Sequence, residues 1–254
     1  MNRRGVLVAA VSAMIVSNAQ AQQPLKAAGQ DAKPYVLHEE NALSGLALDL
    51  TRAISKQMGV PIEYQLMVFA DLIPAVQNDQ IDLIVTNLSI TPEREQQVDF
   101  SRPYVTANPE VVVVQSSDVI SYRRLADLQG LPVGAQKGTI QLALLQRTGG
   151  FSEIKVYDTA QDAWNAVASG QVRASITPGV LTLYAAKTGG LPQGTRVTET
   201  YQSASPKPIS ALAVRKGNRE LLDRVNVALD QMEHDGTLQA ILNKYGLDDL
   251  TRPK

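Results

Sequence analysis

The stretch Thr86-Asn87-Leu88-Ser89-Ile90-Thr91-Pro92-Glu93-Arg94 joins an apolar segment to the start of a helix. The segment 81–88 is apolar enough to form a strand that is buried on both faces. Thr91 is a favourable N-cap, and proline is favoured at the first helical position, so we expect a helix to begin at Pro92. A buried strand that leads directly into a helix is typical of an α/β fold.

Arg94 lies in the first turn of this expected helix. A cation there opposes the helix macrodipole, at a cost of about 0.3 to 1 kcal/mol, unless an anion binds the guanidinium and the free backbone N–H groups. Pairing with Glu93 or Asp99 at the surface is the alternative, and the spacing alone leaves both interpretations open. Polar side chains at the end of the strand favour an anion site that lines a cleft: Thr86, Asn87 and Ser89.

Strand and helix patterns alternate outward from this stretch. We expect strands at 62–69, 81–88, 111–114, 132–135, 154–157, 172–177 and 211–214, and helices at 46–58, 71–78, 139–147, 161–169, 218–235 and 237–245. The first helix should end at Gly59, a residue type common after a helix C-terminus. Strands separated by crossover helices predict mostly parallel sheets, with ligands at their carboxyl edges.

A second strand-to-helix junction follows at Gln136-Lys137-Gly138-Thr139. Gly138 allows a tight turn and Thr139 can cap the next helix, which would expose further backbone donors beside Lys137. An ordinary turn is the alternative, and a solvated Lys137 is the commoner situation for such a side chain.

Composition excludes several classes of function. The 254 residues carry 24 basic and 25 acidic side chains, so there is no excess positive charge for nucleic acid. The absence of cysteine excludes disulfides and thiolate metal sites. The two histidines, His38 and His234, are more readily explained as solvated or capping residues than as metal ligands. Trp164 shares a helical face with apolar residues and is expected in the core. We expect no metal and no cofactor.

The first 21 residues are typical of a signal peptide. A basic start at Arg3 and Arg4 precedes the apolar stretch 5–16, and Ala19-Gln20-Ala21 offers a small-x-small cleavage pattern. The apolar stretch is too short to span a membrane. We therefore expect an exported protein, cleaved after Ala21, that works in the periplasm.

The mature sequence resembles the polar-amino-acid class of bacterial extracellular solute-binding proteins, family 3. The resemblance rests on an ordered set of motifs: 45–50 (GLALDL), 72–76 (LIPAV), 81–84 (IDLI), 89–94 (SITPER), 98–101 (VDFS), 103–104 (PY), 125–128 (LADL), 133–134 (VG), 138–139 (GT), 213–217 (AVRKG) and 235–238 (DGTL). Each motif is weak alone, but their number and order make the set specific.

The resemblance implies an α/β, two-lobe periplasmic binding protein fold of the Venus-flytrap type, with mostly parallel sheets and a two-stranded hinge. Residues 22–112 and 209–254 would form lobe 1, and 113–208 lobe 2. The implied function is the substrate-binding component of an ABC importer, which captures a small carboxylate-bearing solute and presents it transiently to an inner-membrane permease. We expect a monomer.

The resemblance also implies roles for individual residues. It places the ligand carboxylate on Arg94, whose planar fork suits a carboxylate better than lysine does. It places an aromatic packing surface at Phe69, strand-end contacts at Thr86, Asn87 and Ser89, and a lobe 2 contact at Thr139. Further candidate ligand contacts are Tyr35, Lys137 and Thr177.

One position departs from the family pattern. Relatives that bind α-amino acids usually hold the ammonium with an acid of the second lobe, and here Pro178 occupies that position. Either another acid substitutes, for which Asp31 is the best candidate, or the ligand lacks an ordinary α-ammonium. An enzyme on the same scaffold, similar to cyclohexadienyl dehydratases and using Asp31 as its acid, is the alternative function. A sensor that delivers its ligand to a receptor kinase is a third.

Overall fold

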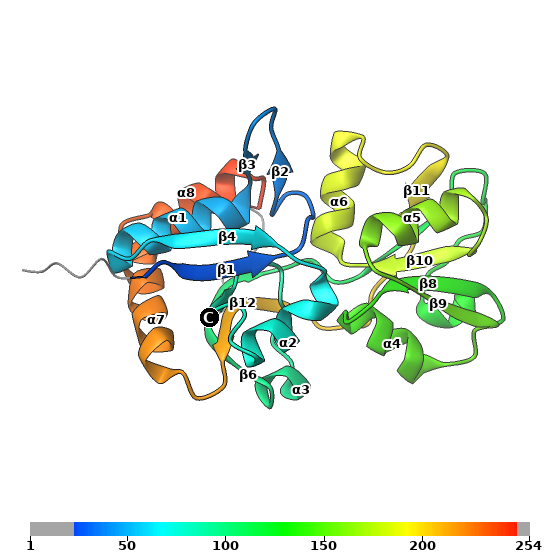
Figure 1. Ribbon diagram of the computed structural model, residues 1–254. Coiled ribbons are helices and arrows are strands. Elements are labelled where there is room, and N and C mark those ends of the chain that lie inside the picture. The colour runs from blue at the N-terminus through cyan, green and yellow to red at the C-terminus, as the bar shows by residue number, and fades with distance from the viewer. Residues whose placement is uncertain (1–22, 248–254) are drawn as a thin grey trace, which may run out of the picture.

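The computed structural model describes residues 23–247, so the expected signal peptide lies outside the described residues. Two α/β lobes lie side by side, each with its own sheet (Figure 1). The blue and cyan N-terminal part and the orange and red C-terminal part form the first lobe, and the green and yellow middle part forms the second. No helix within residues 23–247 combines the length and apolarity that a membrane crossing requires.

The first lobe contains a five-stranded sheet in the order β4-β1-β5-β12-β6. Its strands are β1 (Leu25–Gly29), β4 (Ile62–Leu66), β5 (Leu83–Ile84), β6 (Val98–Thr106) and β12 (Ile209–Arg215), with a small hairpin of β2 (Leu37–His38) and β3 (Leu43–Ser44). Its helices are α1 (Leu46–Met58), η1 (Phe69–Asp71), α2 (Leu72–Gln77), α3 (Pro92–Glu95), α7 (Arg219–His234) and α8 (Thr237–Lys244).

The second lobe contains a five-stranded sheet in the order β11-β7-β10-β8-β9. Its strands are β7 (Val111–Gln115), β8 (Pro132–Gln136), β9 (Glu153–Tyr157), β10 (Ala174–Thr177) and β11 (Thr195–Val197). Its helices are η2 (Leu125–Leu128), α4 (Ile140–Thr148), α5 (Ala160–Ala168) and α6 (Gly179–Thr188).

Both sheets are mixed rather than mostly parallel. Parallel pairs join β1 to β4 and β5, and β8 to β9 and β10. Antiparallel pairs join β12 to β5 and β6, and β7 to β10 and β11. The antiparallel pairs all involve β7 or β12, the strands that the chain enters directly from the other lobe, whereas parallel neighbours need a crossover helix between them.

Hydrophobic burial explains the helices that the sequence predicts. Leu46, Leu50 and Ile54 form the fully buried stripe of α1, which ends at Gly59 with φ +67°, as expected. Trp164 is buried in the second lobe, which confirms its predicted place in a core. Helix α6 was not expected, because its sequence, GVLTLYAAKT, has no regular apolar spacing that would mark one face.

Two extended segments connect the lobes, one before β7 and one before β12. The backbone N–H of Ala107 in the first donates to the carbonyl of Pro208 in the second (2.7 Å). Glu110 Oε1 accepts hydrogen bonds from Tyr201 (3.0 Å), Ser203 (2.6 Å) and Ser205 (3.2 Å). The connections are therefore tied together. The second sheet starts at Val111, two residues before the expected boundary at 112/113, and the exact lobe boundaries stay a prediction.

Candidate functional site

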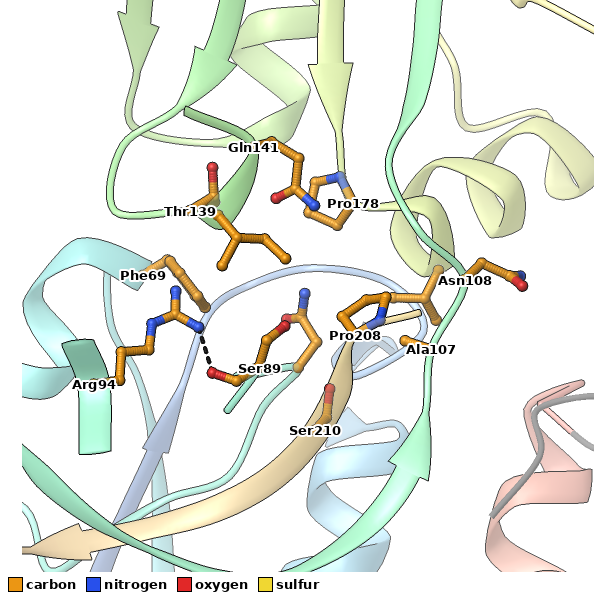
Figure 2. A pocket seen from close by; sticks show the side chains of 13 residues that line it. Phe69, Ser89, Arg94, Ala107, Asn108, Thr139, Gln141, Pro178, Pro208 and Ser210 are labelled. Carbon is orange, nitrogen blue, oxygen red and sulfur yellow. Dashed lines mark hydrogen bonds between the residues drawn. The ribbon is translucent and has the colours of Figure 1, made fainter. Parts of the chain in front are cut away.

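A pocket lies where the two lobes face each other (Figure 2). Both lobes and both connections line it: Phe69, Asn87, Ser89, Arg94, Ala107, Asn108, Thr139, Ile140, Gln141, Pro178, Val180, Pro208 and Ser210.

Arg94 enters the pocket from the first turn of α3. Thr91 caps this helix by accepting a hydrogen bond from the Arg94 N–H (3.3 Å), and Pro92 occupies the first position, as predicted. The Arg94 side chain is only 7% exposed, and its guanidinium carbon lies 5.6 Å from the centre of the Phe69 ring, a cation–π arrangement. The local sequence thus places a cation on an aromatic face inside the cleft.

The guanidinium of Arg94 joins the two lobes. Nη1 donates to the carbonyl of Ser89 (2.7 Å) and Nη2 to the carbonyl of Gly138 in the second lobe (2.9 Å). Gly138 has φ +75°, which confirms the predicted tight turn. Because these two bonds use only two of the five N–H donors of an arginine, three remain for a ligand.

No carboxylate among the described residues forms an ion pair with Arg94. Asp99, the surface partner considered from the sequence, instead pairs with Lys216 (Asp99 Oδ1 to Lys216 Nζ, 2.9 Å). Burial lowers the pKa of Arg94 to about 10, although the nearby charge of Glu93 acts in the opposite direction. A buried charge without a partner costs several kcal/mol, so an anion bound beside the guanidinium would be strongly favoured.

Two helices of the second lobe begin at the pocket wall. Thr139 caps α4 by accepting from the Leu142 N–H (3.2 Å), as predicted, and the first-turn residues Ile140 and Gln141 line the pocket. Pro178 is the N-cap of α6, and Val180 in its first turn also lines the pocket. Helix N-termini carry partial positive charge, so both add to the potential of Arg94.

Four buried polar side chains form a hydrogen-bonded row across the cleft. Gln136 Nε2 donates to Gln30 Oε1 (2.9 Å), and Gln30 Nε2 donates to Asn87 Oδ1 (2.7 Å). Thr86 Oγ1 donates to the same Asn87 oxygen (3.1 Å). Since Gln136 belongs to the second lobe, this row is a second bridge between the lobes. Sequence reasoning gave no role to Gln30 or Gln136, because their pairing joins strand ends 106 residues apart.

The structure brings together five of the predicted site residues at the pocket and leaves five away from it. Phe69, Asn87, Ser89, Arg94 and Thr139 line the pocket, whereas Asp31, Tyr35, Thr86, Lys137 and Thr177 do not. Their roles in binding stay predictions.

Each residue outside the lining has a different environment. The half-exposed Asp31 carboxylate lies 2.8 Å from His38 Nε2, and Lys137 is exposed. Tyr35 is fully buried in the first-lobe core, where burial raises its pKa to about 12. Thr86 is buried and hydrogen-bonds to Asn87. Thr177 accepts a hydrogen bond from Trp164 Nε1 (3.2 Å) and pairs with Thr182 (2.8 Å).

Of the remaining lining residues, Pro178 was placed at the ligand site by the family resemblance, and the others were not assigned to the pocket from the sequence. Ala107, Asn108, Pro208 and Ser210 come from the connections between lobes or the strand that follows, and nothing local in the sequence shows that these segments meet. The hydroxyl of Ser210 is buried without a hydrogen-bond partner. Within residues 23–247 there is no cluster of three or more acids and histidines that could hold a metal ion.

Comparison with known proteins gives consistent results. Residues 26–248 match the model of the bacterial extracellular solute-binding proteins, family 3. The arginine-binding extracellular protein ArtP of Bacillus subtilis (strain 168) is 33% identical over 217 residues, 85% of this chain and 82% of the relative. The ABC transporter arginine-binding protein 1 of Escherichia coli (strain K12) is 29% identical over 208 residues, 81% and 82% of the two chains.

Solved structures share the fold. An ancestral arginine-binding protein bound to arginine superposes with a TM-score of 0.79 at 33% identity, covering 89% of this chain and 99% of that one. An ancestral amino acid-binding protein described as a precursor of cyclohexadienyl dehydratase gives a TM-score of 0.77 at 29% identity, covering 87% and 95%.

Proposed function

The chain belongs to the bacterial extracellular solute-binding proteins, family 3, and from that premise we propose that it captures a small carboxylate-bearing solute, an amino acid or a similar molecule, between its lobes. The relatives named above are binding proteins, and this chain is a binding protein rather than an enzyme. Its solute would pass to the membrane permease of an ABC importer, the type of transporter named for the Escherichia coli relative.

The observation that carries the proposal is that Arg94 is buried and has no ion-pair partner among the described residues. An arginine that is 93% buried and has no ion-pair partner among the described residues lowers the stability of the fold if no anion is bound. Its three remaining N–H donors allow a two-pronged, charge-assisted contact with a carboxylate, which offsets that cost. A carboxylate-bearing ligand therefore explains why the protein keeps this arginine.

Binding would favour the closed arrangement of the lobes. Arg94 contacts the solute from the first lobe, and the N-terminal turn of α4 contacts it from the second. A ligand that touches both lobes stabilises the closed state more than the open one, and this difference in affinity is what shifts the population.

Location and assembly form the finer part of the proposal. Cleavage after Ala21 would release the mature chain into the periplasm, as the basic start and short apolar stretch of residues 1–21 support. There the protein would work as a monomer and contact its permease transiently. Mass spectrometry of the exported protein and light scattering of the purified one test these two points.

Ligand binding tests the proposal directly. A thermal-shift screen over amino acids and other small carboxylates should identify solutes that raise the unfolding temperature, since a ligand specific for the native state stabilises it. Arg94→Ala should then weaken binding by about 1.5 to 3 kcal/mol in a calorimetric titration. Arg52→Ala, which removes an exposed arginine paired with Asp49 on α1, is the matched control. Equal affinities of Arg94→Ala and the control would refute the carboxylate contact.

A further inference from the structure

We propose that the solute is a carboxylate without an accompanying ammonium group, so that this site discriminates against α-amino acids such as arginine. This inference rests on the proposed function and narrows the class of ligand.

The first observation is the sign of the charge in the pocket. Arg94 is the only ionisable side chain among the described residues that line it, and Arg94 has no ion-pair partner there. Glu93, next to it in the chain, and Glu110, whose Oε1 already accepts three hydroxyl hydrogen bonds, line a neighbouring cavity instead. The N-terminal turns of α4 and α6 add partial positive charge from the opposite wall. All these contributions favour an anion, and none compensates a second cation.

The second observation is that several neutral acceptors around the pocket already receive hydrogen bonds. Asn87 Oδ1 receives hydrogen bonds from Gln30 and Thr86, which leaves the Asn87 amide nitrogen, a donor, for the pocket. Thr139 Oγ1 receives the Leu142 N–H and donates to the carbonyl of Gln136. The carbonyls of Ser89 and Gly138 accept from Arg94.

The third observation concerns the acid that the sequence offered as a substitute. Asp31 does not line the pocket, and its two carboxylate oxygens both lie 2.8 Å from His38 Nε2 on an exposed part of the first lobe. Pocket groups that stay free of hydrogen bonds are uncharged, such as the buried Ser210 hydroxyl. A hydroxyl can hold a polar group of the solute but cannot neutralise an ammonium buried beside a guanidinium.

Matched pairs of probes isolate the ammonium. Each pair differs only in that group: L-glutamate against glutarate, and L-phenylalanine against 3-phenylpropionate, with L-arginine as the amino acid named for the relatives. Isothermal titration of the wild-type protein should show that, in a pair that binds, the member without the amino group binds at least tenfold more tightly. L-Arginine should bind more weakly still, because it carries two cationic groups.

Two variants test the electrostatic cause. Gln141→Glu replaces a buried amide on the pocket wall by a carboxylate of the same shape, in the first turn of α4, where an acid is compatible with the helix dipole (Figure 2). Pro178→Asp places an acid at the N-cap of α6, and aspartate is one of the residues preferred at N-caps. At least one variant should reduce the tenfold preference or reverse it, whereas Gln161→Glu on the exposed face of α5 should not.

The outcomes separate the inference from the function on which it rests. Wild-type protein that binds the amino acid of a pair as tightly as its partner, or more tightly, overturns the inference and leaves the proposed function intact. A preference that neither variant changes overturns it as well, since charge would not be the cause. If the protein binds none of the probes and no carboxylate in the wider screen, the proposed function itself fails.

Discussion

Arg94 combines three properties that are rarely found in one side chain of a stable fold. It is buried, it has no acidic partner among the described residues, and it still hydrogen-bonds to the backbone of both lobes. Its position in the first turn of a capped helix could be read from the sequence. Its contact with Gly138 could not, because that contact depends on how the lobes meet.

Replacing Arg94 by lysine separates charge from geometry. Arg94→Lys keeps a cation in the pocket but loses the planar fork and the bond that reaches Gly138, so we expect at least a tenfold loss of affinity for the carboxylate solute. Titration calorimetry on wild type, Arg94→Lys and Arg94→Ala gives the ranking. Wild-type affinity in the lysine variant would mean that a point charge suffices.

Strand ends and helix starts are the elements that build the site, and they are also the elements best predicted from sequence. Thr91 and Thr139 cap α3 and α4 as expected, because a cap is a local interaction within four residues. The strand expected at 81–88 is reduced to β5, since the chain leaves the sheet after Ile84 and turns toward the cleft. Helix α6 was missed because its apolar residues have no regular spacing that would mark one buried face.

The cap of α4 provides a prediction of stability. Thr139→Val keeps the shape of the side chain but removes the hydroxyl that accepts from Leu142, so the free energy of unfolding should fall by about 1 kcal/mol. Urea titration followed by circular dichroism measures this change. Thr148→Val, at the exposed C-terminal end of the same helix, should cost less, and an equal loss would contradict the capping role.

A buried acid links β6 to the start of α7. Asp99 accepts from the Gly217 N–H (2.8 Å) and pairs with Lys216 (2.9 Å). Burial raises the pKa of Asp99, but Lys216, the Gly217 N–H and Arg219 together outweigh burial and lower it below its usual value. A carboxyl with a lowered pKa stabilises the folded state above its unfolded-state pKa, and this contribution is lost as the pH falls through the folded-state value.

Acid titration of the unfolding temperature tests this link. The wild-type protein should lose stability as the pH falls below about 4, and Asp99→Asn should show a lower unfolding temperature at neutral pH but a shallower decline in acid. Asp31→Asn, at a half-exposed hydrogen bond to His38, serves as the comparison. Parallel acid profiles for wild type and Asp99→Asn would exclude the proposed contribution of Asp99.

Within residues 23–247, three sets of side-chain contacts join the two lobes or the segments that connect them. They are the bond between Arg94 and Gly138, the bond between Gln30 and Gln136, and the clamp of hydroxyls around Glu110 at the connections. Resemblance to a known family predicted two lobes and a double connection. It did not predict which side chains bridge them, because partners far apart in sequence leave no local pattern.

Breaking the glutamine bridge should loosen the closed arrangement. Gln136→Met removes the donor to Gln30 with little change of volume, so the ligand-free protein should populate more open forms and bind its solute more weakly. Small-angle X-ray scattering should show a larger radius of gyration than for wild type. Gln161→Met, on the exposed face of α5, should leave both quantities unchanged, and an unaltered radius for Gln136→Met would show that the bridge does not hold the lobes.

Because Arg94 hydrogen-bonds to the backbone of both lobes, it limits how the ligand specificity of this protein can change. In the proposed function Arg94 binds the solute through its free N–H groups, and the same side chain joins the lobes through its bond to Gly138. Replacing Arg94 would weaken ligand binding and closure of the lobes at the same time. We therefore expect new ligand specificities to arise at wall positions such as Gln141 and Pro178. Substitutions there leave the hydrogen bond between Arg94 and Gly138 in place.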